Sequence, residues 1–201
     1  MKNIAIFASG TGSNARKIIE YFQDRPDIAV ALLISNKASA AVLPMASSFG
    51  IKTLVIDRTG FYHSQDLLEI LREYEIDLIV LAGFLWLVPP YLVANYRRRI
   101  INIHPALLPK YGGKGMYNHF VHEAVHAAGE KQSGITIHYV NEQYDEGDII
   151  FQATCELEPG DKPDTIAGKV LQLEHTNFPK VIDALLSKTE MPETALFKAK
   201  Y

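Results

Sequence analysis

The chain alternates between short runs of apolar residues and segments whose apolar positions recur with the spacing of an α-helix. Apolar runs without a polar face are typical of strands that are buried on both sides of a sheet. The predicted strands are Ile4–Ala8, Ile28–Ser35, Thr53–Ile56, Leu78–Ala82, Ile100–Ile103, Gly134–Val140 and Ile149–Glu156. The helices predicted between the first five strands are Ser13–Phe22, Ala40–Phe49, Ser64–Tyr74 and Pro90–Tyr96. Such alternation favours right-handed crossovers and a mostly parallel, doubly wound (Rossmann-like) α/β sheet.

The pattern changes after residue 130. Gly134–Val140 alternates with period two, and a polar Tyr-Asp-Glu-Gly-Asp segment at 144–148 separates it from Ile149–Glu156. Two strands joined by a polar loop predict an antiparallel C-terminal extension of the sheet. Asp164–Leu186 predicts a long amphipathic helix that is interrupted near Pro179. Because no composition break follows, we expect a single domain over residues 1–188 and a frayed C-terminal tail over residues 189–201.

Composition and charge narrow the class of protein. The chain has 201 residues, 48% hydrophobic and 21% charged, with a net charge of −3. This is ordinary globular composition without a general basic field, so we expect no nucleic-acid partner, and any anionic substrate needs a local site. Cys155 is the only cysteine, which excludes an internal disulfide and fits a reducing compartment. The apolar stretch Leu78–Tyr91 is cut by Gly83 and Pro89, too short for a membrane span, so we expect a cytoplasmic protein.

A glycine-rich turn, Ser-Gly-Thr-Gly-Ser-Asn at residues 9–14, joins the first predicted strand to the first helix. Its backbone amides and the positive end of the helix would suit an anion, most naturally a phosphate. The turn lacks the third glycine of a dinucleotide fingerprint and the Gly-Lys-Ser/Thr of a triphosphate loop. A plain strand-to-helix turn is the alternative. Ser13 and Asn14 favour a phosphomonoester site because they add side-chain hydrogen bonds where the helix begins.

Asn102 and His104 end the fifth predicted strand, two residues apart, so their side chains can point to the same side. An amide donor beside an imidazole suits acyl transfer, with Asn102 stabilising an oxyanion and His104 handling a proton. The alternative is that both cap the strand and the following turn. Asp145 or Asp148 could orient a histidine, or could merely form Asx turns in the loop. Distance along the sequence cannot bring Asp145 to His104.

Three histidines, His119, His122 and His126, fall at helical spacings of three and four. One helix face could hold all three, which permits a metal site, but a partly exposed helix face is the favoured interpretation and no metal is expected. Cys155 lies within an apolar strand and is expected to be a small buried side chain rather than a nucleophile.

Taken together, these motifs resemble the phosphoribosylglycinamide formyltransferases of purine synthesis. The resemblance runs from Ile4 to about Leu186. Its most specific element is Asn-Ile-His-Pro-Ala-Leu-Leu-Pro at 102–109, and the glycine turn at 9–14 narrows it to this branch of the formyltransferases. Further matching segments are Leu-Ala-Gly-Phe at 81–84, Ser-Gly-Ile-Thr-Ile-His-Tyr-Val at 133–140, Asp-Glu-Gly-Asp-Ile-Ile at 145–150 and Glu-His at 174–175.

The resemblance implies a formyltransferase fold and direct transfer of a formyl group from the cosubstrate 10-formyltetrahydrofolate to the amino group of phosphoribosylglycinamide, through a tetrahedral intermediate. It implies small-molecule substrates only, and it leaves a homodimer open. The catalytic residues that it implies are Asn102, His104 and Asp145. The substrate-binding residues are Gly12, Ser13, Asn14, Ala15, Arg16 and Glu174. The folate-binding residues are Leu85, Trp86, Leu87, Val88, Asn102, Asn141 and Asp145.

The sequence departs from the common pattern of this family in three places. Trp86 stands where arginine is frequent, no arginine lies around residues 61–65, and the segment 112–120 differs from the usual loop. The alternatives are a deformylase, a formyltransferase acting on another amine, and a phosphate-binding module without catalytic activity. The last needs only the turn at 9–14 and would not require an oxyanion donor beside a proton carrier.

Overall fold

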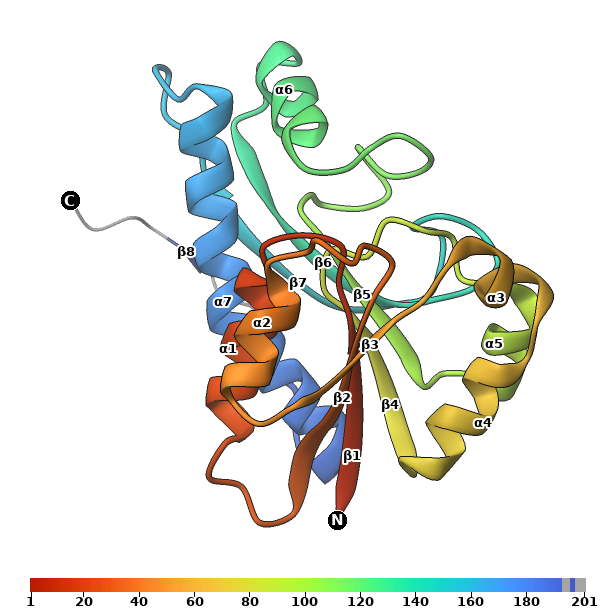
Figure 1. The fold of residues 1–201 in the computed structure, drawn as a ribbon. Coiled ribbons are helices and arrows are strands. Elements are labelled where there is room, and N and C mark those ends of the chain that lie inside the picture. The colour runs from red at the N-terminus through yellow and green to blue at the C-terminus, as the bar shows by residue number, and fades with distance from the viewer. Residues whose placement is uncertain (193–195, 198–201) are drawn as a thin grey trace. The chain divides into compact units, whose positions relative to one another are not determined.

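The structure of the chain is a computed structural model that describes residues 1–192 and 196–197 (Figure 1). Contacts between Cα atoms divide the chain into two compact parts, Met1–Asn102 and Ile103–Tyr201, which are described in turn.

The first part alternates strands and helices as predicted. Its strands are β1 (Lys2–Phe7), β2 (Ile28–Ser35), β3 (Lys52–Val55), β4 (Ile76–Leu81) and β5 (Ile100–His104), the last of which runs on into the second part. Its helices are α1 (Ser13–Phe22), α2 (Val42–Ser48), α3 (Arg58–His63), α4 (Asp66–Glu73) and α5 (Pro90–Asn95). Figure 1 shows α1 and α2 on one side of these strands and α3, α4 and α5 on the other.

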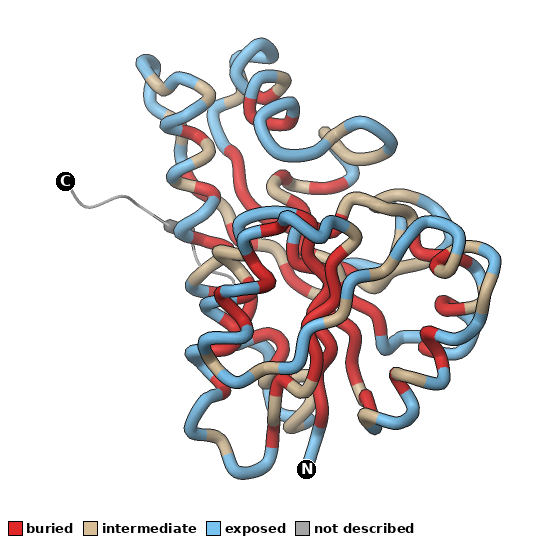
Figure 2. Tube along the Cα trace, viewed as in Figure 1, coloured by how far each residue is buried: buried red, intermediate tan, exposed pale blue. Residues whose placement is uncertain are grey.

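The strands of the first part pair in parallel in the order β3-β2-β1-β4-β5. The chain moves outward from β1 to β3, then crosses to the other side of β1 and continues through β4 and β5. This is the doubly wound topology that the alternation of elements predicts. The centre of the core is β1, whose residues Ile4 to Phe7 are completely buried, as Figure 2 shows for the central strands.

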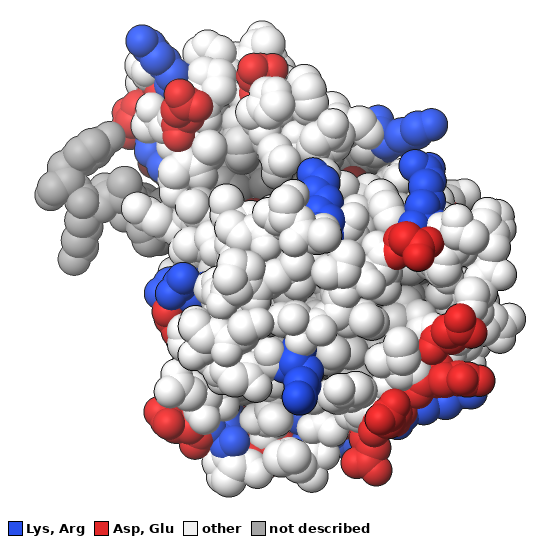
Figure 3. All heavy atoms as spheres, viewed as in Figure 1, with Lys and Arg blue, Asp and Glu red and all other residues white. Residues whose placement is uncertain are grey.

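The second part contains the antiparallel extension. Its elements are α6 (His119–Ala127), β6 (Gln132–Tyr139), β7 (Ile149–Glu156), α7 (Pro163–Ser187) and the short β8 (Leu196–Phe197). Strands β6 and β7 form an antiparallel hairpin, β8 pairs in parallel with β7, and α7 packs against β6, β7 and α6. The predicted α/β class, with parallel strands followed by an antiparallel pair, is confirmed. None of the helices among the described residues has the length and apolar character of a membrane span. The face drawn in Figure 3 carries both basic and acidic side chains.

Helix α7 corrects one prediction. It runs without a break through Pro179, although an interruption was expected there. A proline removes one backbone hydrogen bond and crowds the preceding turn. Here the neighbouring Phe178, Val181 and Ile182 are completely buried, so we attribute the continuity of the helix to the packing of this apolar face.

Two further differences lie at short elements. Helix α3 is not predicted from the sequence, because its one buried side chain, Phe61, shows no helical period. The helix begins at the Asp57 side chain, which accepts a hydrogen bond from the Gly60 amide at 2.9 Å. In the predicted tail, the Thr189 amide donates a hydrogen bond to the Ala184 carbonyl, and Leu196–Phe197 forms β8. Residues 193–195 and 198–201 of that tail lie outside the described residues.

Candidate active site

Two loops meet at the carboxyl ends of β1 and β4. The Ser9 amide donates a hydrogen bond to the Gly83 carbonyl at 3.1 Å, and the Leu85 amide donates to the Ser9 hydroxyl at 3.2 Å. The strand order reverses between β1 and β4, and in open α/β sheets ligands bind outside the carboxyl ends of the strands at such a point. The fold therefore places the predicted segments 12–16 and 85–88 at the edge of the sheet where a ligand site is expected.

Gly12 shapes the start of α1. Its φ of 79° lies in the left-handed region, and a Cβ atom there would collide with the side chain of Val42. A residue other than glycine would be strained at this position in both respects. Ser13 and Asn14 are half-buried, Ala15 is buried and Arg16 is exposed, and no side chain caps this end of the helix among the described residues. The start of a helix, with its backbone amides and its positive end, is the kind of site that suits an anion.

The segment 85–88 rests on a cluster of aromatic rings. The Trp86 ring lies 5.6 Å from Phe61, 6.0 Å from Tyr62 and 6.1 Å from Phe84, measured between centroids. The Tyr62 hydroxyl donates a hydrogen bond to the Leu87 carbonyl at 3.0 Å. Residues 85 to 87 are half-buried and Val88 is buried, so the segment offers a firm, partly apolar wall.

Asn102 lies at the carboxyl end of β5, paired with Leu81 of β4. It is half-buried. His104 follows two residues later on the same strand, and the alternation of a β-strand directs side chains two residues apart to one face.

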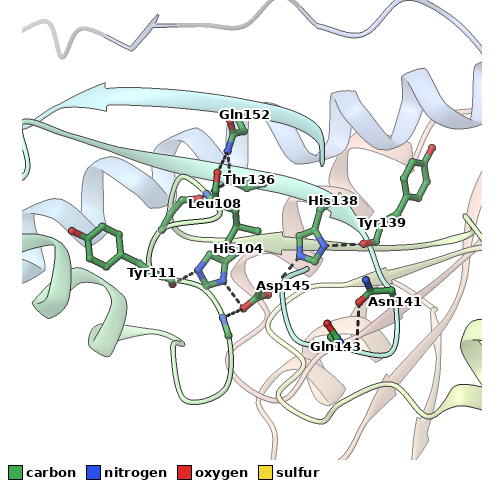
Figure 4. Close-up of polar contacts among 12 residues, drawn as sticks. His104, Leu108, Tyr111, Thr136, His138, Tyr139, Asn141, Gln143, Asp145 and Gln152 are labelled. Atoms are coloured by element: carbon green, nitrogen blue, oxygen red, sulfur yellow. Dashed lines mark hydrogen bonds and ion pairs between the residues drawn. The ribbon is translucent and has the colours of Figure 1, made fainter. Parts of the chain in front are cut away.

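His104 and Asp145 approach each other in the second part (Figure 4). The Nδ1 atom of His104 lies 3.4 Å from Oδ2 of Asp145, and the Gly113 amide donates a hydrogen bond to the same oxygen at 3.0 Å. His104 is 3% exposed, so the contact is shielded from water. The Nε2 atom of His104 lies 2.7 Å from the Tyr111 carbonyl, and because a carbonyl can only accept, Nε2 carries a hydrogen. The fold thus makes the link that sequence distance could not.

The loop between β6 and β7 presents Asp145. Asp145 has a φ of 56°, and a Cβ atom at Gly147 would collide with the Tyr139 carbonyl, so the loop folds tightly against the end of β6. Asn141 lies in the same loop, where its side chain accepts a hydrogen bond from the Gln143 amide at 2.9 Å. Of the two aspartates that could orient a histidine, Asp148 is exposed. Asp145 is the one that lies beside the buried His104.

A buried network fixes the turn that follows His104. The Thr136 hydroxyl donates to the Ala106 carbonyl at 2.7 Å and accepts from the Leu108 amide at 3.0 Å. The Gln152 amide donates to Thr136 at 2.9 Å and to the Leu108 carbonyl at 3.0 Å, as Figure 4 shows. Neither Thr136 nor Gln152 was predicted as part of a site. Their signal in the sequence is a polar residue within an apolar strand.

Burial and charge act in opposite directions on the central pair. Burial, the largest cause, lowers the pKa of His104, and the charge of Asp145 and the hydrogen bond to Tyr111 oppose it. For Asp145 the largest single cause is burial, which raises its pKa, but the contact with His138, the charge of His104 and the hydrogen bond from the Gly113 amide together lower it. Asp145 is therefore a carboxylate at neutral pH.

His138 is a residue that sequence reasoning did not assign to the site. Its Nε2 atom lies 3.6 Å from Oδ1 of Asp145, and its Nδ1 atom lies 2.9 Å from the Tyr139 carbonyl (Figure 4). The signal was present in the period-two pattern of β6, which places His138 on the same face as Thr136.

The remaining predicted residues lie as follows. Glu174 is 8% exposed on α7. On α6, His119 and His126 are exposed and His122 is buried, so the three predicted histidines do not share one environment. Over residues 1–192 and 196–197, no group of three or more histidine, cysteine or acidic residues could hold a metal ion. Cys155 is buried, as predicted, and burial raises the pKa of its thiol.

Comparison with known proteins shows the family of the chain. The formyl transferase family matches residues 2–182. A chloroplastic phosphoribosylglycinamide formyltransferase of Arabidopsis thaliana is 42% identical over 190 residues, which are 92% of this chain and 65% of that protein. The enzyme of that name from Bacillus subtilis is 36% identical over 200 residues, covering 97% of this chain and 100% of the relative. The chain spans 65% and 61% of the length of two plant relatives.

Solved structures with a similar fold cover most of the chain. The phosphoribosylglycinamide formyltransferase of Anaplasma phagocytophilum has a TM-score of 0.85 at 33% identity, covering 92% of this chain and 87% of that one. The enzyme of that name from Bacillus halodurans has a TM-score of 0.83 at 38% identity, covering 94% and 97%. The chain therefore belongs to the formyl transferase family. Within that family, these relatives carry the name phosphoribosylglycinamide formyltransferase.

Proposed function

We propose that the chain transfers a formyl group from 10-formyltetrahydrofolate to the amino group of phosphoribosylglycinamide. The observation that carries this proposal is the buried His104–Asp145 contact at 3.4 Å, in a chain of the formyl transferase family. A buried imidazole held by a carboxylate is the arrangement that proton handling and charge stabilisation in acyl transfer require.

The reaction would pass through a tetrahedral intermediate. The lone pair of the neutral amine attacks the formyl carbon, the new C–N bond forms, and the carbonyl oxygen takes up the negative charge. The Asn102 amide and an N–H of His104 stabilise this oxyanion. Its collapse breaks the bond to N10 of the folate, and the proton lost by the amine ends on N10. Asp145 orients His104 and favours the cationic form of the ring.

Nε2 is the His104 atom that would face the oxyanion, because Nδ1 faces Asp145. In the structure the Nε2 hydrogen is bonded to the Tyr111 carbonyl, so the substrate oxygen has to replace that acceptor. The segment after Tyr111 contains Gly112 and Gly113, and the φ of Gly113 is 93°. We infer that this short segment moves to release Nε2.

The proposal assigns the phosphate of the substrate to the start of α1. The amides of that turn and the positive end of the helix favour a dianion, and the collision that a Cβ would cause at Gly12 supports a close backbone approach. Glu174 would accept hydrogen bonds from the ribose hydroxyls. The residues assigned to this substrate are Gly12, Ser13, Asn14, Ala15, Arg16 and Glu174.

The folate would be held by the wall at 85–88 and by the loop of Asp145. Trp86 would pack against the flat pterin, since its ring is already supported by other aromatic rings. The residues assigned to the folate are Leu85, Trp86, Leu87, Val88, Asn102, Asn141 and Asp145.

We also propose a cellular compartment for this activity. The single cysteine supports a reducing compartment, and we place the activity in the cytoplasm. A homodimer is a separate hypothesis, which sedimentation equilibrium would test.

The decisive experiment mixes the protein with phosphoribosylglycinamide and 10-formyltetrahydrofolate and follows the absorbance of the folate product. We expect formation of tetrahydrofolate only when the amine is present. Formate release without the amine would instead identify a deformylase. No reaction from a protein shown to be folded by circular dichroism would refute the proposal.

A further inference from the structure

Asp145 contacts two histidines at once. Its Oδ2 atom faces Nδ1 of His104 at 3.4 Å, and its Oδ1 atom faces Nε2 of His138 at 3.6 Å. Both rings are almost fully buried, His104 at 3% and His138 at 2% exposed. Figure 4 shows the carboxyl group lying between the two imidazoles.

Backbone carbonyls fix the hydrogen on one nitrogen of each ring. The Tyr111 carbonyl accepts from Nε2 of His104, and the Tyr139 carbonyl accepts from Nδ1 of His138. The nitrogens that face Asp145 therefore carry a lone pair in the neutral rings and a hydrogen only in the imidazolium forms. With both rings neutral, each contact with the carboxylate sets lone pair against lone pair.

One proton added to this cluster converts one of the two contacts into a charge-assisted hydrogen bond. A second proton would place two cations beside one carboxylate in a buried site, which is electrostatically disfavoured. The two rings therefore compete for the same carboxylate and for one proton. Burial is the largest cause that lowers the pKa of His104, and the charge of His138 acts in the same direction.

We infer that His138 is a positioning residue of the transfer site, which holds Asp145 through Oδ1 and competes with His104 for the proton that the reaction needs. This inference rests on the proposed function for its kinetic consequences, but not for its protonation chemistry. The titratable groups around His138 include Asp145 in the β6–β7 loop and His104 on β5. His122 on α6 is a further titratable group, whose pKa is lowered by burial and by the charge of His104.

Two substitutions distinguish the holding of Asp145 by His138 from the competition of His138 with His104 for a proton. In His138→Gln, the side-chain amide can still donate to Oδ1 of Asp145 but cannot take up a proton. In His138→Leu, both properties are lost. His126→Gln is the matched control, because His126 is an exposed histidine on α6. Circular dichroism and urea unfolding would show which variants fold.

The first measurement is the titration of the ring nitrogens by ¹⁵N NMR without substrate, with the His104 resonances assigned by their absence in a His104→Asn variant. In the wild type we expect His104 to titrate in two coupled steps. In His138→Gln we expect a single step at higher pH, and in His126→Gln the wild-type curve. An unchanged His104 titration in His138→Gln would overturn the competition.

The second measurement is the pH dependence of kcat and KM for formyl transfer. We expect His138→Gln to keep its rate within about threefold and to hold it to higher pH than the wild type, because the pKa of His104 rises. We expect His138→Leu to lose about tenfold to a hundredfold in kcat with little change in KM, the size of a lost hydrogen bond to a charged group. A folded His138→Leu with the rate and profile of the wild type would overturn the positioning role. A wild type that transfers no formyl group would refute the proposed function, and the NMR titration would still decide this inference.

Discussion

The start of α1 and the cluster around Asp145 are built from different materials. At α1 the groups that we propose to bind the ligand are backbone amides, and one left-handed glycine next to Val42 sets their geometry. Around Asp145 the groups are side chains from β5, β6 and the β6–β7 loop, held by backbone carbonyls and amides. A backbone site is encoded by neighbouring residues, whereas a side-chain cluster depends on the packing of distant segments. The first therefore depends mainly on one glycine, and the second depends on each of its side chains.

The largest expected effect is at the side-chain cluster. Asp145→Asn keeps the shape of the side chain but removes the charge that favours the cationic form of His104. We expect formyl transfer to fall by about two to four orders of magnitude, the effect of removing a key electrostatic or acid–base group. Steady-state kinetics at saturating folate would check this, and a rate equal to that of the wild type would show that Asp145 has no catalytic role.

A change at the backbone site should act on binding rather than on chemistry. Gly12→Ala introduces a Cβ that collides with Val42 at a φ of 79°. We expect a loss of about 1–3 kcal/mol in the free energy of unfolding, the cost of such strain. We also expect a rise in KM for the phosphorylated substrate that exceeds the fall in kcat. Gly10→Ala is the control, since a Cβ there meets nothing within 4 Å. Equal effects of the two substitutions would contradict this account of the turn.

The turn after His104 offers a test of the packing that supports the cluster. Thr136→Val removes a hydroxyl that makes three hydrogen bonds, two of them buried, whereas Thr136→Ser keeps it. We expect the valine variant to lose about 1–3 kcal/mol in the free energy of unfolding, because the Leu108 amide and the Ala106 carbonyl are left without this partner. Urea unfolding would measure this difference. If serine were as destabilising as valine, the hydroxyl would not be the group that matters.

The smallest expected effect is on how the free energy of unfolding depends on pH in the acid range. The folded-state pKa of Asp145 is lowered, so its contribution is present above the unfolded-state value of about 4 and is lost as the pH falls through the folded-state pKa. We expect the stability difference between wild type and Asp145→Asn to shrink below about pH 4. Urea midpoints taken between about pH 6 and pH 2 would show this, and a constant difference would mean that the carboxylate adds nothing to the fold.

Sequence patterns predicted the elements with strong periodicity. The bounds of α1, β2 and β7 agree with the structure, because each is a clear apolar or amphipathic run with turn residues on both sides. Helix α3 could not be predicted because it shows no period, and the continuity of α7 through Pro179 could not because it depends on tertiary packing.

The site shows the same division. Asn102 and His104 could be paired from the sequence because they share one strand. The contact of Asp145 with His104 requires the β6–β7 loop to reach β5, and the resemblance to a known family, not local chemistry, suggested it. His138 and Thr136 could not be assigned from the sequence, because a polar residue in a strand can have many partners. Their partners are seen only in the folded structure.

The Tyr111 carbonyl on His104 has a consequence for selectivity between states of the reaction. This carbonyl already accepts the hydrogen of Nε2, in the place that the proposed function gives to a substrate oxygen. Exchanging it for the formyl oxygen of bound folate replaces one neutral acceptor by another and gains little. Exchanging it for an oxyanion gains a charge-assisted bond, roughly twice as strong. Under the proposed function, this internal acceptor would cancel the ring's affinity for the ground state and leave its affinity for the transition state, which is the difference that accelerates a reaction.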